Sequence, residues 1–202
     1  MTEDRSPYYS WGNGAAMRVS PCGWVMSCEY YCKTGYWPVQ GQNIAKRSAA
    51  VTHNHPEGIK GAMAVADAIF ICRLFRGRYI VAAKPVISSL KDCKNMVRQW
   101  LEKRYGYDLS RTLDIIRPTY QFDESCQGTV PQAVTAFLES TDFEDAIRNA
   151  ISLGGDSDTL ATITGSIAEA AYGVPQWIVD KAWEFLDEPL RDVCRKWRMF
   201  LT

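Results

Sequence analysis

The chain has 202 residues, enough for one domain with a full hydrophobic core, and we predict a single domain over residues 1–202. Its 23 lysines and arginines balance its 23 aspartates and glutamates, so the net charge argues against nucleic acid or an anionic membrane as partner. No apolar run reaches the length of about 18 residues that crosses a membrane, and the start, MTEDRSPYYS, lacks the segments of a signal peptide, so we expect a cytoplasmic protein.

The first part of the chain is the least regular. Residues 1–45 are rich in Tyr, Gly, Trp and Cys, and we predict a loop there with one short helix at most. Residues 58–75 then place apolar side chains on a broad helical face. RYIVAA (78–83) is the only strand-like run and is too short to build a sheet. Residues 89–106 are again helical and end at Gly106, a typical helix stop.

Helical patterns continue to the end of the chain. Residues 129–140 carry one apolar side. Thr141 and Glu144 are spaced as a capping box that opens a further helix. Pro175 and Pro189 are placed for the first turn of two later helices. The periodicity therefore predicts an all-α fold.

Seven cysteines, an odd number, are spread along the chain. Without a secretion signal, we expect reduced thiols that are mostly packed in the core. A zinc site is the alternative, because Cys22, Cys28 and Cys32 precede His53 and His55. The spacing differs from the paired Cys-x-x-Cys of structural zinc sites, so packed thiols are favoured.

The segment GGDSDT (154–159) joins two apolar helical runs and holds more acceptor oxygens than helix capping needs. Asp156 and Asp158 stand about 200° apart on a helix, so their carboxylates can meet one target only if the backbone turns. The two preceding glycines permit that turn. With the Thr159 hydroxyl, the carboxylates form a set of hard oxygens suited to Mg²⁺ or Mn²⁺. The alternative is a solvated helix start capped by Ser157 or Asp158.

Several blocks of the sequence resemble the ADP-ribosylglycohydrolase family, which includes the dinitrogenase-reductase-activating glycohydrolases and the ADP-ribosyl-acceptor hydrolases. Three carry most of the likeness: WGNGAAMRVSPCGW, VTHNHPEGIKGA and SLGGDSDTLATITGSIAEAAYG. Two more are similar to its bacterial members: YGYDLSRTLDIIRPTY and SCQGTVPQAVTAFLESTDFEDAIRNAI. The blocks cover most of residues 10–175 in the family's order.

The resemblance implies an all-α fold around a centre of two Mg²⁺ ions, with Mn²⁺ as the alternative, that cleaves the glycosidic bond between ADP-ribose and an acceptor. The expected partner is ADP-ribose or an ADP-ribosylated protein. Three positions match the family's late metal ligands: Asp156, Asp158 and Thr159. Five match residues of the substrate pocket: Ser10, Trp11, Gly12, Asn13 and His53. The family usually carries Tyr or Phe at position 11.

Each residue type suits the role that the resemblance implies. Gly12 and Gly14 let backbone amides approach a diphosphate. The Trp11 ring can stack on a flat base, and the His53 imidazole can donate to phosphate or ribose oxygens. Taken alone, each has an ordinary alternative, such as a turn, a surface aromatic or a helix cap. Arg18 suits a phosphate or a structural salt bridge equally well.

Two elements of the family have no match in this sequence. A GDxxGxxxE segment would supply the proposed catalytic glutamate, and a TDDT block the other metal ligands. We therefore expect the N-terminal part of the family domain to be absent, and the catalytic residue stays unknown. Segments 26–43 and 74–90 also look unlike the family, as insertions or rewritten loops.

Three functions remain open at this point. The first is a magnesium-dependent hydrolase whose missing part is supplied by a second chain or was lost from this sequence. The second is a catalytically inactive ADP-ribose-binding module. The third is a regulatory remnant whose partner chain covers exposed core surface.

Overall fold

The computed structural model describes residues 6–77, 79–81 and 84–201, with the side chains of 80, 81, 84 and 85 left out. Most of the described chain is helical and only two short strands are present in it, which confirms the all-α prediction. It divides into two compact units, residues 1–172 and 173–202; the single-domain expectation stays a prediction. The helices are α1 (Gly14–Met17), α2 (Ser20–Trp24), α3 (Cys28–Thr34), α4 (Val39–Ala50), α5 (Pro56–Arg76), α6 (Leu90–Tyr105), α7 (Leu113–Ile116), α8 (Cys126–Glu139), α9 (Phe143–Ser152), α10 (Ser157–Tyr172), α11 (Gln176–Phe185) and α12 (Glu188–Leu201).

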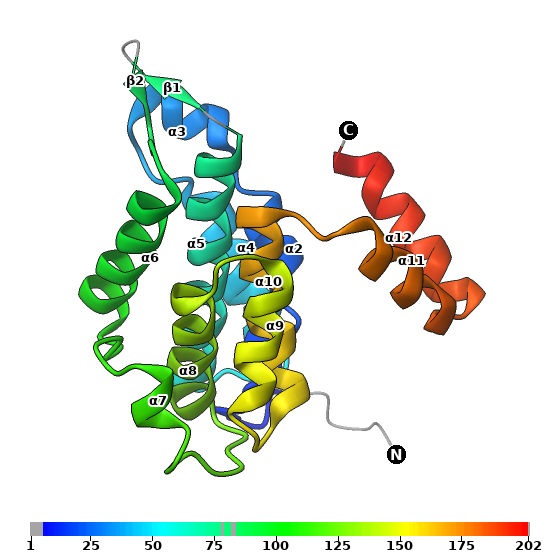
Figure 1. The fold of residues 1–202 in the computed structure, drawn as a ribbon. Coiled ribbons are helices and arrows are strands. Elements are labelled where there is room, and N and C mark those ends of the chain that lie inside the picture. Colours follow the sequence, from blue (N-terminus) through cyan, green and yellow to red (C-terminus); the bar gives the residue numbers. More distant parts are fainter. Residues whose placement is uncertain (1–5, 78, 82–83, 202) are drawn as a thin grey trace. The chain divides into compact units, whose positions relative to one another are not determined.

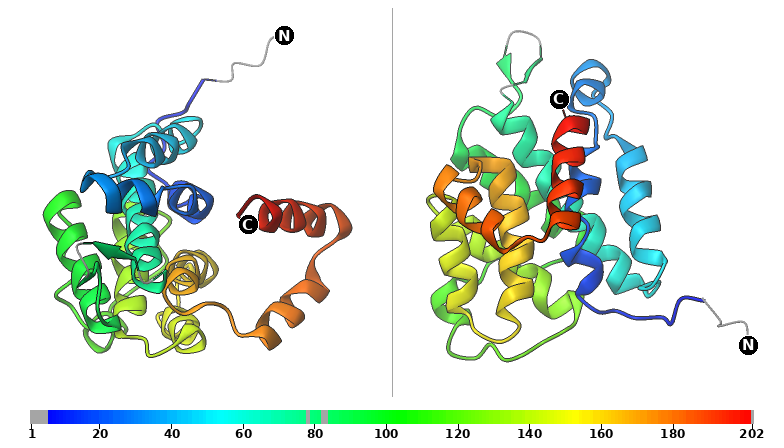
Figure 2. Two further views of the ribbon diagram at one scale, coloured as in Figure 1. Left: turned by 90° about the horizontal axis from the view of Figure 1, so that it is seen from above. Right: turned by 90° about the vertical axis from the view of Figure 1, so that its right-hand side faces the viewer.

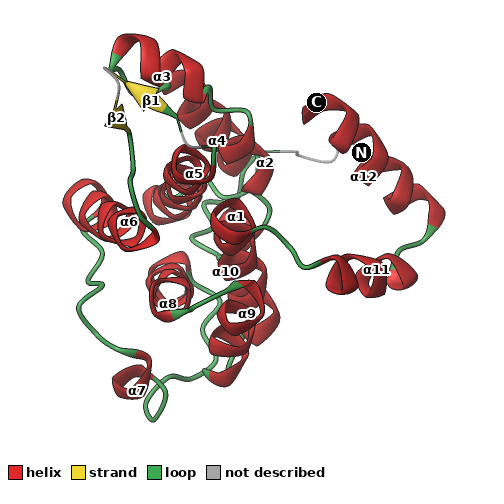
Figure 3. Cartoon of the chain, turned by 45° about the horizontal axis from the view of Figure 1, so that its top comes forward, coloured by secondary structure: helices red, strands yellow, loops and turns green. Residues whose placement is uncertain are grey.

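Helix α5 is the centre of the first unit. Every residue from 64 to 72 is buried, all around the helix, as expected of a helix enclosed by others. Helices α1, α2, α4, α6, α8 and α10 all pack against it, and Figure 3 shows α1, α4 and α6 around its axis. The alanines of its sequence let these neighbours approach closely.

Helices α8, α9 and α10 pack against one another beside α5 (Figures 1 and 2). Helix α10 carries small residues where it meets α9. A Cβ atom on Gly165 would lie 2.9 Å from Cδ1 of Ile147, so glycine is needed for this close approach. The packing seats the start of α10 firmly in the unit.

A buried carboxylate joins α4, α5 and α6. Asp67 is fully buried and accepts hydrogen bonds from Nε1 of Trp37 (3.0 Å), Nε2 of Gln42 (2.9 Å), Nε1 of Trp100 (2.9 Å) and the hydroxyl of Tyr105 (2.6 Å). The rings of Trp37 and Trp100 stack with centroids 4.0 Å apart. Because a buried charge is tolerated only when its oxygens are bonded, this cluster specifies how the three helices meet.

The prediction of at most one short helix in residues 1–45 is wrong, because α1, α2 and α3 lie there and α4 begins there. The first three helices are 4, 5 and 7 residues long, too short to show a helical period in the sequence. Tertiary packing holds them instead. A Cβ atom on Gly23 of α2 would lie 2.7 Å from Cβ of Ile69, so α2 touches α5 directly.

Two helix starts differ from the sequence prediction. Helix α9 is capped by Asp142, whose side chain accepts from the amide of Asp145 (2.8 Å), while Asp145 accepts from the amide of Thr141 (2.7 Å). The predicted box is thus shifted by one residue from Thr141 and Glu144. Pro175 is the N-cap of α11 and not a first-turn residue.

The strand-like run was predicted not to build a sheet. Its residues 78, 82 and 83 lie outside the described part of the chain. The remainder contributes β1 (Ile80–Val81), which pairs antiparallel with β2 (Lys84–Pro85). The two strands form a two-stranded sheet between α5 and α6, so the expectation that this run builds no sheet is wrong.

The second unit consists of α11 and α12. Within it, Arg191 donates to the backbone carbonyl of Trp183 (3.0 Å) and holds the turn between the helices. Neither helix has a fully buried residue. Among the helices that the structure describes, none is long and apolar enough to cross a membrane.

Candidate functional site

The segment between α9 and α10 forms the turn that the sequence predicts. Gly154 and Gly155 both adopt left-handed backbone angles, with φ of 72° and 62°. A Cβ atom on Gly155 would lie 2.9 Å from the carbonyl oxygen of Gln121 and from the ring of Tyr120. Glycine at 155 is therefore needed both for the turn and for contact with the loop before α8.

Helix α10 begins at Ser157, so Asp156 stands just before the helix while Asp158 and Thr159 belong to its first turn. The side chain of Asp158 is exposed and accepts from the amide of Thr159 (3.0 Å). Thr159 is buried, and its hydroxyl lies 3.6 Å from Sδ of Met17. Three oxygen-bearing side chains thus gather at the positive end of a long helix.

The two carboxyl groups converge. The pKa of Asp158 is lowered, first by a hydrogen bond with the side chain of Asp156 and then by the backbone amide of Thr159. Two neighbouring carboxylates repel each other when both are ionised. A divalent cation bound by both would relieve that repulsion. The donor set therefore fits a hard metal ion.

Asn13 connects the glycine-rich loop to this turn. Its Nδ2 group donates to Oδ2 of Asp156 (2.6 Å) and to the hydroxyl of Thr129 (3.0 Å). The side chain is nearly buried, with 7% exposed. Asn13 and Asp156 are 143 positions apart in the sequence. Two of the predicted blocks therefore meet at one place.

The rest of the loop is held along the segment that leads into α8. Gly12 forms an antiparallel bridge with Ser125, and the amide of Cys126 donates to the carbonyl of Trp11 (2.9 Å). The hydroxyl of Ser10 accepts from the amide of Gly12 (3.0 Å). In Figure 1 the segment before α8 and the turn before α10 lie at the same end of the unit. The side chain of Ser10 thus stabilises the backbone of the loop.

His53 lies against the loop's two glycines. A Cβ atom on Gly12 would come within 3.2 Å of Nε2 of His53, and one on Gly14 within 3.3 Å. The ring thus occupies the space that larger side chains would fill. Burial lowers the pKa of His53, and the positive charge of Arg18 lowers it further, so the ring is neutral near pH 7.

A chain of hydrogen bonds holds the ring of His53. Arg18 donates to the hydroxyl of Thr52 (2.7 Å), and that hydroxyl lies 2.6 Å from Nδ1 of His53. A hydroxyl carries two lone pairs besides its hydrogen, so this contact orients the ring with the proton on either nitrogen. Arg18 forms no ion pair with a described residue, and its pairing with a phosphate stays a prediction.

Trp11 is an exposed residue of the glycine-rich loop. It is 52% exposed, and its ring meets the ring of His55 edge-on with centroids 5.5 Å apart, while the ring of Tyr9 meets His55 at 4.7 Å. A cavity of about 550 Å³ opens here, lined by residues 8–12 and 122–125. Exposed aromatic rings beside a glycine-rich loop suit a flat ligand such as a base.

Sequence reasoning missed residues that support these groups. His55, not His53, caps α5, and its Nδ1 accepts from the amide of Glu57 (3.1 Å). Thr129 of α8 accepts from Asn13, the residue that also bonds Asp156, and burial raises the pKa of Tyr120 in the preceding loop, with the charges of Asp123 and Asp156 adding to it. Of these residues, only His55 had a signal in the sequence, because it stands directly before a proline that begins a helix.

The zinc alternative finds no support in the described residues, where no group of three or more His, Cys, Asp or Glu side chains could hold a metal ion. All seven cysteines are free thiols, and five of them are buried. This agrees with the packed thiols expected from the sequence.

Comparison with known proteins decides the family. A sequence model of the ADP-ribosylglycohydrolase family matches residues 2–198. The chain belongs to the ADP-ribosylglycohydrolase family. This confirms the resemblance of the sequence blocks, while the roles of the individual site residues stay predictions.

Relatives of this family member span bacteria, archaea and animals. It is 31% identical to an uncharacterized protein of Archaeoglobus fulgidus over 87% of this chain and 55% of that protein. It is 29% identical to human ADP-ribosylhydrolase ARH3 over 87% of this chain and 53% of that protein. It is 24% identical to the ADP-ribosylarginine hydrolase Tri1 of Pseudomonas putida over 85% of this chain and 42% of that protein. The chain spans about half the length of the curated relatives it matches.

A solved structure shows the same fold. The chain superimposes on an ADP-ribosylglycohydrolase-related protein complex with a TM-score of 0.58 at 22% identity, covering 83% of this chain and 52% of that one. At this identity, the likeness supports the all-α fold alone.

Proposed function

We propose that this chain carries the metal-binding and ADP-ribose-binding residues of a hydrolase that releases ADP-ribose from a modified acceptor. The observation that carries the proposal is the 2.6 Å hydrogen bond between Asn13 and Asp156, in a chain that belongs to the ADP-ribosylglycohydrolase family. It joins the loop proposed for the nucleotide to the turn proposed for the metal. A ligand on one would thus lie next to the other.

Asp156, Asp158 and Thr159 would hold the cation, with Mg²⁺ as the proposed ion and Mn²⁺ as the alternative. Their oxygens are hard, they gather in one turn, and the two carboxyl groups already converge. When bound, such an ion would supply positive charge that orients hydroxyl groups and a water. A second ion, which the resemblance implies, would need ligands from another side, because two cations close together repel strongly.

The loop side of the site would bind the ADP-ribose moiety. The amides of Gly12 and Asn13 already donate to the Ser10 hydroxyl and to the carbonyl of Glu124, so side chains of the loop would make the contacts to the diphosphate. The imidazole ring of His53 would donate to a phosphate or ribose oxygen, and Trp11 would stack on the base. Asn13 would keep the Asp156 carboxylate turned toward the cation.

The alternative proposal is an ADP-ribose-binding module without turnover, or a regulatory remnant completed by a partner chain. It is motivated by the sequence, in which no GDxxGxxxE segment supplies the acid that protonates or deprotonates the reacting groups. The same site residues serve both proposals up to the binding step. Catalysis is what separates them.

One sample can test both. ADP-ribose is titrated into the chain by calorimetry with and without MgCl₂, and release of ADP-ribose from an ADP-ribosylated protein is then measured. The hydrolase proposal predicts Mg²⁺-dependent binding and release, both reduced in Asp156→Asn and unchanged in the exposed control Asp180→Asn. Binding without release would support the module. Absence of binding in both conditions would refute the hydrolase and the module.

A further inference from the structure

A second cavity lies at the other end of α8. It has a volume of about 420 Å³ and is lined by residues from α6, from the end of α8 and from the connection to α9. Helix α8 begins beside the glycine-rich loop and ends here, so its 14 residues separate the two places by about 20 Å. The cavity is therefore distinct from the site described above. Its size is in the range of pockets that hold small molecules.

Three cations line this cavity and no acidic residue does. Lys91, Lys94 and Arg98 follow one another along α6 at spacings of three and four, so they share one face of the helix. Lys91 and Arg98 are exposed, and neither forms an ion pair with a described residue. The positive charge of this face is thus left without a counter-charge in its own lining.

Lys94 reaches furthest into the protein. Its ammonium group donates to the backbone carbonyl of Ser140, and the rings of Phe137 and Tyr172 lie 5.7 and 5.9 Å from it. An ammonium has three N–H donors, so two remain beyond this bond. Burial lowers the pKa of Lys94, partly offset by the charge of Asp145. A partly desolvated cation with spare donors gains from an anion beside it.

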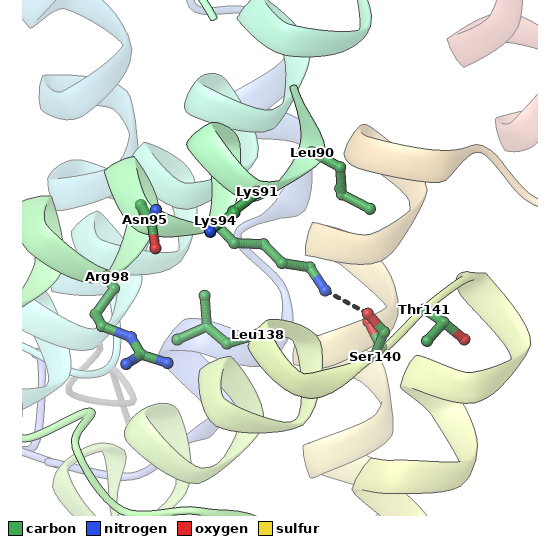
Figure 4. Close-up of a pocket in the computed structure, with 8 residues that line it drawn as sticks. All are labelled: Leu90, Lys91, Lys94, Asn95, Arg98, Leu138, Ser140 and Thr141. Atoms are coloured by element: carbon green, nitrogen blue, oxygen red, sulfur yellow. Dashed lines mark hydrogen bonds between the residues drawn. The ribbon is translucent and has the colours of Figure 1, made fainter. Parts of the chain in front are cut away.

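The walls between the cations are apolar. Figure 4 shows the Lys94 side chain running toward Ser140, with Arg98 on the other side of Leu138. Leu90 adds a second apolar wall. The cavity thus combines donors for several anionic oxygens with surface for an uncharged group.

We infer that this cavity binds the phosphate groups of a small phosphorylated molecule. Arg98 offers a planar fork of donors that matches two phosphate oxygens, and the two lysines add charge. The phosphate could belong to free pyrophosphate or to a nucleotide, whose base would lie against the leucines.

Calorimetry on the full chain tests the inference, in low salt with EDTA so that no metal–pyrophosphate complex forms. Inorganic pyrophosphate and AMP are titrated separately. We expect saturable binding that weakens at least tenfold in the double variant Lys91→Ala/Arg98→Ala, because two of the three cations are removed. Both side chains are exposed, so the variant should keep its fold, which circular dichroism checks. Tighter binding of AMP would identify a nucleotide, and tighter binding of pyrophosphate the free anion.

The control is Lys103→Ala, which removes an exposed cation from another face of α6 and should leave the affinity within about twofold. Pyrophosphate that fails to saturate the wild type would overturn the inference. So would unchanged binding in the double variant, which would place the anion outside this cavity, or an equal loss in Lys103→Ala, which would indicate general charge attraction. The proposed hydrolase function is tested separately by Asp156→Asn, because none of its residues lines this cavity.

Discussion

Replacing Asn13 with alanine removes the hydrogen bond between the glycine-rich loop and the turn that we propose binds the metal. The bond is 2.6 Å long, its acceptor is a carboxylate, and Asn13 is nearly buried. Hydrogen bonds to charged groups contribute about 1.5–3 kcal/mol. If that energy fixes the Asp156 carboxylate, its loss should weaken Mg²⁺-dependent ADP-ribose binding about 10- to 100-fold, at tenfold for every 1.4 kcal/mol.

The assay is calorimetry of Asn13→Ala with ADP-ribose at saturating MgCl₂, beside the wild type and Asn43→Ala. Asn43 is an exposed residue of α4, outside both proposed binding places, and should change nothing. Thermal unfolding of each variant separates a lost ligand contact from a lost fold. Asn13→Ala that remains folded and binds ADP-ribose as the wild type does would refute the reasoning.

Four further predictions follow from the same contacts. Thr52→Val should raise the Kd for ADP-ribose about five- to tenfold by calorimetry, because Nδ1 of His53 loses a hydrogen bond worth about 1 kcal/mol, whereas Thr52→Ser should retain the affinity. Because the pKa of His53 is lowered in the folded state, the unfolded chain binds the proton at higher pH than the folded chain does. The free energy of unfolding, measured in urea, should therefore fall as the pH drops below about 6.5, and it should fall less in His53→Gln. Asp67→Asn should lower the free energy of unfolding by about 3 kcal/mol or more, measured in urea, because the new amide opposes buried donors. Gly155→Ala should destabilise more than Gly154→Ala in the same assay, since both residues have positive φ but only Gly155 also meets a backbone carbonyl; equal losses would contradict this account of the turn.

The long helices and the turn could be predicted from the sequence because their signals are local. The apolar period of α5, the glycine that ends α6, and the two glycines before α10 each act within a few residues. Short helices have no such signal. Helices α1 and α2 exist because they pack on α5, and the sequence alone does not show that surface.

In the candidate site, too, local features could be predicted from the sequence and tertiary contacts could not. The identities of Asp156, Asp158 and Thr159 were visible as a dense set of oxygens in one segment, and the turn that brings them together followed from the glycines. The bond from Asn13 could not be predicted, because it depends on how α1 and α10 meet across the fold. The chain from Arg18 to His53 is likewise a product of tertiary structure, since Arg18 lies 34 positions from Thr52.

The central claim is that the oxygens of Asp156, Asp158 and Thr159 bind a hard divalent cation. Electron paramagnetic resonance of Mn²⁺ counts bound and free ions directly and requires neither substrate nor turnover. The account predicts saturable Mn²⁺ binding that Mg²⁺ displaces and that Asp156→Asn abolishes, while Asp180→Asn binds as the wild type does. Equal Mn²⁺ binding in Asp156→Asn and the wild type would contradict it.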